Sequence, residues 1–252
     1  EQLSRRNLHE LCDQLTPQDE QAFAELWRHL GLSTDWSLDY TTIGHDSQVT
    51  SQRAFLRNFA RGEAYLADAP CMWDVTFQMA VSQAELDDKE LPGAYHKLAF
   101  HGDGADVVIA TTRPELVVSC VALVAHPDDE RYQSLVGTTV TTPVFGVEVP
   151  FVAHPLAEPD KGTGVAMICT FGDTTDVTWW RELNLPARAV IGRNGRFQSE
   201  SPEWLTSDEA RERYERIAGL KPKQVQKQMV EMLTETGEML REPESITHPV
   251  KF

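Results

Sequence analysis

The chain has 252 residues, of which 41% are hydrophobic and 25% are charged, and both fractions are ordinary for a globular protein. Its 39 acidic residues outnumber its 23 Lys and Arg, so the formal net charge is −16 at pH 7. This balance argues against a general nucleic-acid-binding protein, whose contact surface is basic. No segment is long and apolar enough to span a bilayer, so we expect no membrane partner.

The cysteines are Cys12, Cys71, Cys120 and Cys169. They lie far apart and form no Cys-x-x-Cys pair, so their spacing predicts neither a zinc ribbon nor a disulfide framework. Isolated thiols of this kind are typical of a protein in the reducing cytosol. The sequence starts without a methionine, and we expect it to be a piece of a longer chain.

The first region, residues 1–92, begins with helices and continues into short strands and turns. Pro17, preceded by a threonine, has the form of a helix start, because proline is favoured at the first helical position. A further helix is predicted over 48–60, where Leu56 and Phe59 are expected to face inward.

The second region, residues 93–200, is rich in β signals. Short apolar runs alternate with turns such as the His-Gly-Asp-Gly turn at 101–104, and one helix is expected over 173–183. Many short strands with few helices favour an α+β fold, with a distorted or closed β-barrel as its core and flanking helices. We predict strands over residues 96–100, 107–110, 121–125, 138–142, 147–152, 165–168 and 188–191.

The third region, residues 201–252, returns to helices. Ser207 has the form of a cap for one helix, and Pro222 is predicted to start another. Pro243 and Pro249 mark an extended exit segment. The apolar residues of the second helix that we expect to face the core are Val225, Met229, Met232 and Leu233.

Two segments carry the polar residues of a candidate site. The first, ATTRPEL at residues 110–116, leaves a predicted buried strand and offers two hydroxyls, an arginine and a glutamate. The second, at 162–176, runs from a Gly-Thr-Gly turn through another strand to the carboxylates of Asp173 and Asp176. Two polar strand ends that face each other would form a small pocket with fixed carboxylates and hydroxyl donors.

The two aspartates suit the start of a helix. If Asp173 opens a helix, Asp176 lies on the same face near the N-terminus, where anions are favoured. Two alternatives stay open at this point: Asp173 serves only as a helix cap, and Asp176 is an ordinary carboxylate on a surface helix.

These motifs resemble the editing domain that is inserted into class I aminoacyl-tRNA synthetases for valine, isoleucine and leucine. The resemblance covers essentially the whole chain, includes the segments at 32–37, 90–95 and 126–132, and is closest to valine-specific members of the actinobacterial type. It implies a barrel fold, a helical stalk over 1–61 and, as activity, hydrolysis of a wrongly formed aminoacyl ester on tRNA.

The resemblance also implies roles for individual residues. Among the candidate catalytic residues, Asp176 would hold the amino group of the aminoacyl moiety, and Asp173 would contact a threonine hydroxyl or orient water. Thr111 and Thr112 would line the pocket and hold the ester or the attacking water. Arg113 would contact the terminal adenosine or a phosphate, with a structural ion pair as the alternative. The further residues assigned to the substrate or the tRNA end are Glu115, Gly162, Thr163, Gly164, Met167 and Phe171.

The expected substrate is threonyl-tRNA(Val). A pocket that activates valine cannot strongly reject threonine, which exchanges a methyl group for a hydroxyl, and the valine enzymes are the standard example of this limit. We expect water as the nucleophile and no acyl-enzyme, because Cys120 and Cys169 have no histidine nearby in sequence. The alternatives are an isoleucine-type domain that removes valine, and an inactive module that only docks tRNA or acts as a spacer.

Three positions depart from the valine-specific pattern. Leu116, Met167 and Gly172 stand where many of these relatives have threonine, lysine and histidine. The changes make the predicted pocket less polar. They leave open which residue contacts the threonine hydroxyl, and they leave room for the isoleucine-type specificity.

The implied partners are the 3′ end of tRNA(Val) with its wrong amino acid and, in the same chain, the rest of the parent synthetase. The His-x-Gly-His and Lys-Met-Ser-Lys-Ser signatures of the class I catalytic core are absent, so we expect no amino-acid activation by these residues. We also expect a cytoplasmic protein without cofactor or metal. Many relatives bind zinc within the segment that corresponds to 63–92, where Cys71 stands alone.

Overall fold

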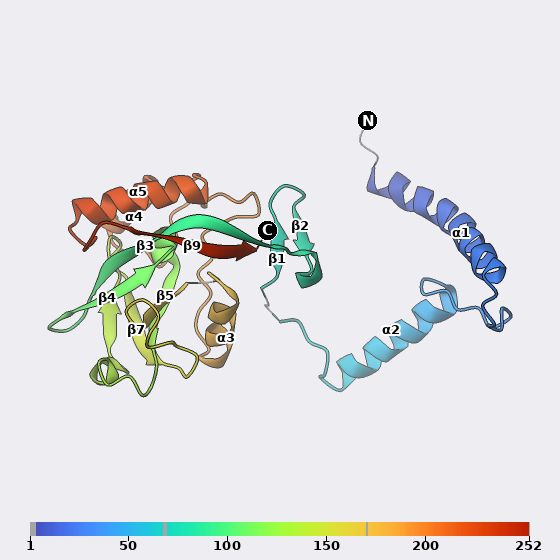
Figure 1. Cartoon of the computed structure of the whole chain (residues 1–252), viewed down its shortest axis with the longest axis horizontal. Coiled ribbons are helices and arrows are strands. Elements are labelled where there is room, and N and C mark those ends of the chain that lie inside the picture. Colours follow the sequence, from blue (N-terminus) through green and yellow to red (C-terminus); the bar gives the residue numbers. More distant parts are fainter. Residues whose placement is uncertain (1–3, 68–69, 170, 252) are drawn as a thin grey trace. The chain divides into compact units, whose positions relative to one another are not determined.

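The computed structural model describes residues 4–67, 70–169 and 171–251. The chain divides into two compact units, Glu1–Asp68 and Ala69–Phe252, which are described separately (Figure 1). Within the described ranges, no helix has the length and apolar character needed to cross a membrane.

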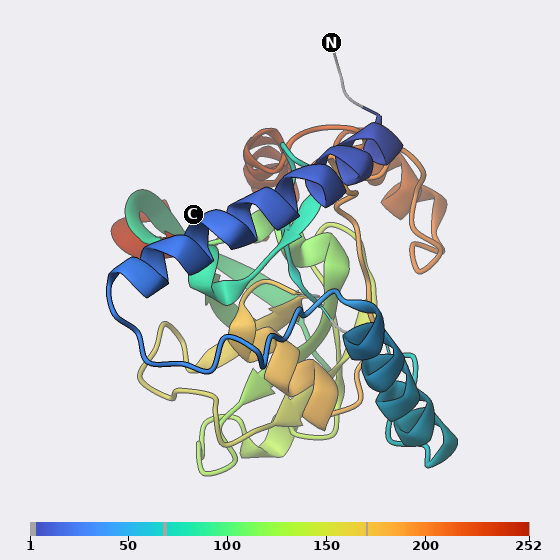
Figure 2. The same cartoon turned by 90° about the vertical axis from the view of Figure 1, so that its right-hand side faces the viewer.

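The first unit consists of two helices, α1 (Arg5–His29) and α2 (His45–Ala60). The hydroxyl of Ser4 caps α1 by accepting a hydrogen bond from the backbone N–H of Asn7 at 3.2 Å. α1 runs unbroken through Pro17 (Figure 2), so the predicted helix start at this proline is wrong. Proline removes one backbone hydrogen bond, and the helical turns on both sides of it outweigh that single loss.

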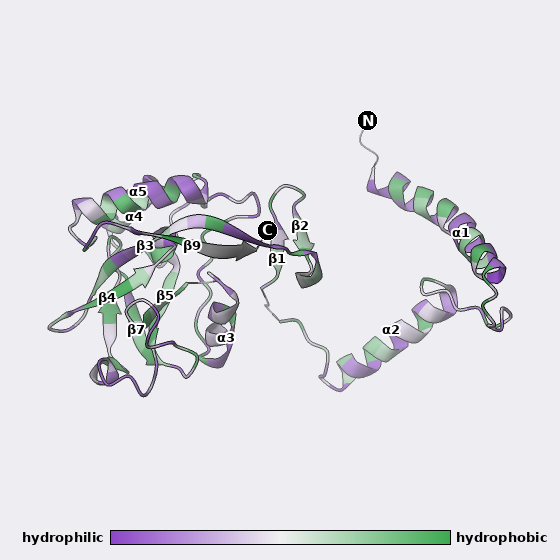
Figure 3. Ribbon diagram, viewed as in Figure 1, coloured by the Kyte–Doolittle hydropathy of each residue, from purple (hydrophilic) through white to green (hydrophobic). Residues whose placement is uncertain are grey.

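The apolar residues of α1 and α2 form stripes along each helix (Figure 3), but neither helix contains a buried residue. Leu56 and Phe59 are 61% and 62% exposed, so the prediction that they face inward is wrong. Helical periodicity identifies the apolar side of a helix, whereas the surface that covers it must come from other residues. The first unit does not supply such a surface.

The second unit is built on a seven-stranded sheet with the order β4-β3-β6-β7-β5-β8, in which β9 also pairs with β3. The first half of β3 pairs with β9 and its second half with β4, and all pairs are antiparallel except the parallel pair β5–β7. The strands are β3 (Asp88–His101), β4 (Asp106–Thr111), β5 (Cys120–Ala125), β6 (Thr139–Thr141), β7 (Glu148–Ala153), β8 (Val165–Cys169) and β9 (Glu244–Lys251). β4 and β8, at the two ends of the order, contact each other, so the sheet is nearly closed.

Helices flank this sheet: α4 and α5 lie along one side and α3 lies elsewhere against it (Figure 1). The flanking elements are α3 (Thr174–Glu182), α4 (Asp208–Glu215), α5 (Pro222–Glu235) and the 3₁₀ helices η1 (Gln83–Glu85), η2 (Pro114–Ser119) and η3 (Gln133–Leu135). The main core joins the sheet residues Phe100 and Phe151 to Tyr214 of α4 and Met229 of α5. A second cluster packs Trp179 of α3 against β5 and β8. The predicted α+β fold, a distorted barrel with flanking helices, is confirmed.

Local predictions in this unit have mixed outcomes. The predicted strand over 188–191 is wrong: Gln198 donates to the carbonyl of Val190 at 2.8 Å, so the segment closes a local turn and does not join the sheet. The extended exit at the C-terminal end forms β9. Ser207 caps α4, as predicted, and the four apolar residues of α5 that were expected in the core are buried. A separate hairpin consists of β1 (Met72–Asp74) and β2 (Met79–Val81).

The core predicts a sharp contrast between two phenylalanines. Phe151 on β7 is fully buried, so we expect Phe151→Ala to lower the free energy of unfolding by about 3–5 kcal/mol. Phe77 is 76% exposed, and Phe77→Ala is expected to change it by no more than about 0.5 kcal/mol. Urea unfolding of both variants measures the difference. Similar losses in the two variants would contradict this description of the core.

Candidate functional site

The Asp-x-x-Asp pair lies at the start of α3. Asp173 is the N-cap, and its Oδ1 accepts from the backbone N–H groups of Thr175 at 2.7 Å and of Asp176 at 3.0 Å. These bonds satisfy donors that the first turn of a helix otherwise leaves unpaired. The helix-cap alternative for Asp173 is therefore present in the structure, and the residue itself is exposed.

Asp176, in the first turn of α3, is buried. It is 6% exposed, so the alternative of a surface carboxylate is wrong. Its Oδ2 accepts from the backbone N–H of Gly172 at 2.8 Å. Burial raises the pKa of Asp176 to about 7, and the charge of Asp173 adds to the rise, against backbone hydrogen bonds that lower it. Near neutral pH this carboxyl group therefore populates both its neutral and its ionised form.

The ATTRPEL segment forms a tight corner at the end of β4. The Oγ1 of Thr111 accepts from the backbone N–H of Arg113 at 3.1 Å, and η2 begins at Pro114. The Nε of Arg113 donates to Oε1 of Glu115 at 3.0 Å, so the ion pair named as an alternative is present. Burial raises the pKa of Glu115, and the charge of Arg113 opposes the rise. The corner thus holds a buried acid beside a fixed guanidinium.

Gly172 joins the corner to Asp176. The Nη1 of Arg113 donates to the carbonyl of Gly172 at 3.3 Å, across 59 positions of sequence, and the N–H of Gly172 donates to Asp176. A Cβ at position 172 would lie 2.6 Å from Oδ2 of Asp176. Glycine suits this position because the carboxyl group occupies the space that a side chain would take. The two predicted segments therefore meet at one residue, Gly172.

The Gly-Thr-Gly turn packs closely against its neighbours. Gly162 has a φ of 61°, and a Cβ there would lie 3.0 Å from the Cβ of Ala110, at the start of the corner. Gly164 has a φ of 85°, and a Cβ there would lie 2.5 Å from Nη2 of Arg131. Left-handed backbone and close packing both favour glycine at these positions. The turn therefore borders the corner on the side of Ala110.

Thr163 and Met167 lie next along this second segment. The carbonyl of Thr163 accepts from the hydroxyl of Tyr132 at 2.8 Å, and its buried Oγ1 has no partner among the described residues. Met167 on β8 is half-buried and packs against the main core.

Phe171 and Thr112 are also anchored by residues outside the predicted site. The ring of Phe171 meets Trp180 of α3 edge-on, with 5.1 Å between the ring centroids. The carbonyl of Thr112 accepts from Nε2 of Gln226 on α5 at 3.2 Å. α5 therefore holds the corner through Gln226. Helical spacing in the sequence does not reveal this contact.

The geometry can be compared with known proteins. Residues 1–243 match the family model described as tRNA synthetases class I (I, L, M and V). The chain belongs to the class I tRNA synthetases.

Individual relatives and a solved structure add detail. The chain is 64% identical over 251 residues to the valine–tRNA ligase of Thermobifida fusca and 61% identical over 250 residues to that of Leifsonia xyli. Each match covers 99% of this chain but only 28% and 29% of the two relatives, so the chain spans less than a third of their length. The Agrobacterium radiobacter K84 AgnB2 LeuRS, solved as a ternary complex with tRNA and LeuAMS, matches with a TM-score of 0.41 and 16% identity, over 94% of this chain and 36% of that chain.

The segment in which many class I relatives bind zinc does not fit a zinc ion in this synthetase chain. Cys71 is its single cysteine. The Oδ1 of Asp74 accepts from the backbone of Thr76 at 2.6 Å and of Phe77 at 2.8 Å, so this carboxylate closes a turn. No group of three or more His, Cys, Asp and Glu side chains that could hold a metal ion occurs in the part of the chain that the structure describes.

The buried Cys169 and the loop histidines His126 and His154 have their hydrogen bonds with other groups of the described chain. Cys169 is buried and its Sγ donates to the carbonyl of Leu116 at 3.2 Å, and burial keeps the pKa of this thiol well above its usual value. Nδ1 of His126 and Nδ1 of His154 each accept a backbone N–H from two residues further on. Nε2 of His154 also pairs with Glu182 at 2.8 Å.

His96 was not among the residues predicted for the site. It is the cross-strand partner of Thr111, so the two side chains share one face of the sheet. His96 is 6% exposed, its Nδ1 has no partner among the described residues, and burial lowers its pKa. In the sequence it is one residue of an ordinary strand, and only the register between β3 and β4 places it beside the corner.

The raised pKa of Asp176 predicts a pH-dependent loss of stability. Its folded value of about 7 exceeds the ordinary 3.8, so between these values the folded chain holds a proton that the unfolded chain has released. The free energy of unfolding therefore falls as pH rises through this window, by up to about 4 kcal/mol. We expect Asp176→Asn to come closest to the wild type below about pH 3.5 and to exceed its stability near about pH 8, in urea unfolding.

Asp173→Asn is the matched control for this titration. Asparagine caps a helix about as well as aspartate, so this variant is expected to keep most of the pH dependence of the wild type. A stability difference between Asp176→Asn and the wild type that stays constant with pH would show that Asp176 is not the titrating group.

Proposed function

We propose that this chain is the editing part of a valine–tRNA ligase and that it hydrolyses threonyl-tRNA(Val). The observation that carries the proposal is the buried carboxyl group of Asp176, fixed by Gly172 beside the Thr111–Arg113 corner. The 64% identity to a valine–tRNA ligase supports the choice of enzyme. In this proposal the chain acts in the cytoplasm within a longer synthetase, whose other parts activate valine and bind most of the tRNA.

The chemistry of the parent enzyme explains why such a site is needed. Threonine and valine have nearly the same shape, so a hydrophobic pocket for valine rejects threonine only weakly. A second site that hydrolyses the threonyl ester corrects this error after the amino acid has reached the tRNA. The substrate is then the 3′ end of tRNA(Val), with a positively charged α-amino group next to the ester.

Asp176 is suited to bind that amino group. An ammonium ion next to the carboxyl group stabilises its ionised form, which offsets the burial that raises its pKa in the free protein. The charged hydrogen bond is strong because the carboxyl group is largely removed from water. Asp173 helps to position Asp176 because it caps α3 and accepts from the backbone N–H of Asp176. The proposal also includes a contact between the Asp173 carboxylate and the substrate hydroxyl or water.

The corner provides the remaining groups. Arg113 is held by Glu115 and Gly172 while 40% of its side chain stays exposed, which suits contact with the terminal adenosine or a phosphate. Thr111 and Thr112 hold the ester or the water. Water adds to the ester carbonyl, the bond to the tRNA ribose oxygen breaks, and free threonine leaves. The surrounding wall in this proposal consists of Glu115, Gly162, Thr163, Gly164, Met167 and Phe171.

A second candidate is removal of valine from tRNA(Ile). It is favoured by the apolar residues Leu116, which is 4% exposed, and Met167, which stand where many valine-specific relatives carry threonine and lysine. A less polar wall has fewer partners for a threonine hydroxyl. Single-turnover deacylation of threonyl-tRNA(Val) and valyl-tRNA(Ile) by the same preparation separates the two candidates.

The decisive experiment compares two isosteric variants in the whole synthetase that carries this chain. We expect Asp176→Asn to slow single-turnover deacylation of threonyl-tRNA(Val) by about a hundredfold, because it removes a charged hydrogen bond worth about 2–3 kcal/mol. Asp173→Asn removes the same charge three residues away and is expected to change the rate only a few-fold, since asparagine preserves the cap.

Full activity of Asp176→Asn would remove this carboxyl group from the mechanism. Equal losses in both variants would indicate that net charge matters and that the position of Asp176 does not. If neither the wild type nor the variants hydrolyse any aminoacyl-tRNA, the module serves only for docking or as a spacer.

A further inference from the structure

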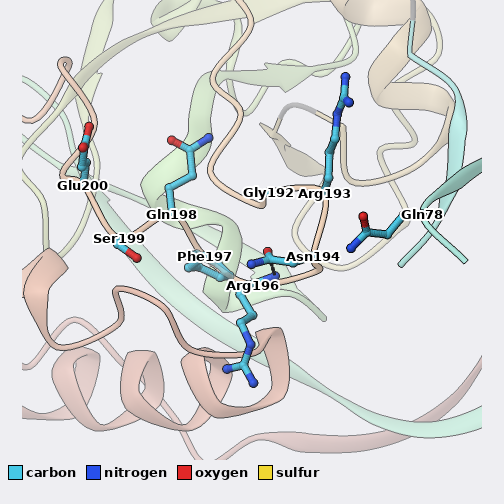
Figure 4. A pocket seen from close by; sticks show the side chains of 9 residues that line it. All are labelled: Gln78, Gly192, Arg193, Asn194, Arg196, Phe197, Gln198, Ser199 and Glu200. Atoms are coloured by element: carbon cyan, nitrogen blue, oxygen red, sulfur yellow. Dashed lines mark hydrogen bonds between the residues drawn. The ribbon is translucent and has the colours of Figure 1, made fainter. Parts of the chain in front are cut away.

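A hollow of about 500 Å³ lies in the second unit and contains none of the residues proposed for editing (Figure 4). It is formed by the turn that follows α3 and by Gln78 of the β1–β2 hairpin. Most of the side chains that line it carry a polar group, and Glu200 is the single acidic residue among them. The side chains that offer hydrogen bonds to a ligand are Gln78, Arg193, Asn194, Arg196, Gln198 and Ser199.

The turn that carries the two arginines is rigidly built. The N–H of Gly195 donates to the carbonyl of Gly192 at 2.9 Å, and the N–H of Gly192 donates to the carbonyl of Arg196 at 2.8 Å. The side chain of Asn194 accepts from the N–H of Arg196 at 3.1 Å. Gly195 has a φ of 69°, and a Cβ there would lie 2.9 Å from Val75, so the turn packs directly on the hairpin.

Neutral groups hold both guanidinium groups in place. The Cζ of Arg193 lies 5.6 Å from the ring centroid of Trp73, whose Nε1 donates to the carbonyl of Arg193 at 2.9 Å. The Nη1 of Arg196 donates to the carbonyl of Gly219 at 3.0 Å. Among the ion pairs of the described residues, none involves either arginine. By contrast, Arg211 and Arg213 of α4 pair with acids of their own helix, and Arg216, which follows α4, pairs with Glu235 of α5. The guanidinium groups of Arg193 and Arg196 are therefore held in place by neutral groups, and no described carboxylate forms an ion pair with them.

The chemistry of this hollow fits phosphate groups. Guanidinium donors match phosphate oxygens in geometry and charge, and they are weakly hydrated compared with ammonium groups. Figure 4 shows the side chains of Arg193 and Arg196 extending in different directions from the turn, which suits two phosphates along one strand better than one clamped anion. Since the chain carries a net charge of −16, a polyanion can approach it only at such local sites.

We propose that the turn at Arg193 and Arg196 binds the phosphodiester backbone of the tRNA whose aminoacyl end is edited. The proposal rests on the proposed function, because it takes tRNA as the substrate. It adds a contact surface separate from the Asp176 site. This surface adds to the affinity for tRNA and fixes the position of the tRNA on the protein. It takes no part in the chemical step.

The test uses the whole synthetase that carries this chain and uncharged tRNA(Val). The variant Arg193→Gln/Arg196→Gln is compared with the control Arg211→Gln/Arg216→Gln, which removes the same charge from two arginines already paired with Asp208 and Glu235. Binding is measured by fluorescence anisotropy at several salt concentrations. We expect the slope of log affinity against log salt to fall by about 1.4–1.8 in the variant and to stay unchanged in the control, because each lost phosphate contact removes about 0.7–0.9.

Two outcomes would overturn the proposal. In the first, both double variants change binding equally, so that only net charge matters. In the second, inorganic phosphate binds saturably in a way that depends on Arg193 and Arg196, while tRNA binding does not depend on them. The turn would then be a site for a free anion. Thermal unfolding of both variants verifies that their folds are intact.

A third variant separates this proposal from the editing mechanism. Asp176→Asn is expected to keep the tRNA affinity and the salt slope of the wild type while losing deacylation. Arg193→Gln/Arg196→Gln is expected to raise KM for threonyl-tRNA(Val) and to leave kcat unchanged. If Asp176→Asn retains deacylation, the role assigned to Asp176 fails; if the wild type hydrolyses no aminoacyl-tRNA, the editing function itself fails. In both cases the binding result for the two arginines is read independently.

Discussion

Gly172 is the residue on which the candidate site depends. Its carbonyl accepts from Arg113 and its N–H donates to Asp176, so this one residue connects the segment after β4 to the first turn of α3. The bond to Asp176 brings the backbone closer to a carboxyl group than a side chain at position 172 permits, since a Cβ there would lie 2.6 Å from Oδ2 of Asp176. The absence of a Cβ therefore makes the arrangement possible.

The two buried acids near Gly172, Glu115 and Asp176, are stabilised differently. Glu115 has Arg113 as a direct ion-pair partner, whereas the interactions of Asp176 with the described residues are backbone hydrogen bonds and the unfavourable charge of Asp173. A buried carboxyl group without a cation is costly in its ionised form. Proteins keep such groups mainly where a ligand supplies the missing charge, which is the reason for assigning Asp176 to the substrate ammonium.

The net charge of the chain is strongly negative, but one turn carries two arginines without ion-pair partners among the described residues. Most of the surface repels a polyanion, since the net charge is −16. The turn at Arg193 and Arg196 is a local exception, in which Trp73 and the carbonyl of Gly219 orient the guanidinium groups without neutralising them. In the proposed function, such a local exception is where an acidic domain would contact RNA.

The sequence by itself determined the features that depend on near neighbours. The cap at Ser207, the inward face of α5 and most strands of the barrel follow from residues a few positions apart, and the motifs at 110–116 and 162–176 identified the segments that meet. Pro17 and the segment 188–191 were predicted wrongly, because a helix tolerates one lost bond and a strand needs a partner that the sequence does not name.

Only the tertiary structure decided which polar groups are buried and what they touch. The same Asp-x-x-Asp spacing fits an exposed cap and a buried acid, and packing against Gly172 assigns Asp173 to the first role and Asp176 to the second. His96 reaches Thr111 through strand register, a relation between distant residues that no local pattern encodes. Burial and charge depend on what surrounds a side chain in space, and for these residues the surroundings come from segments far away in the sequence.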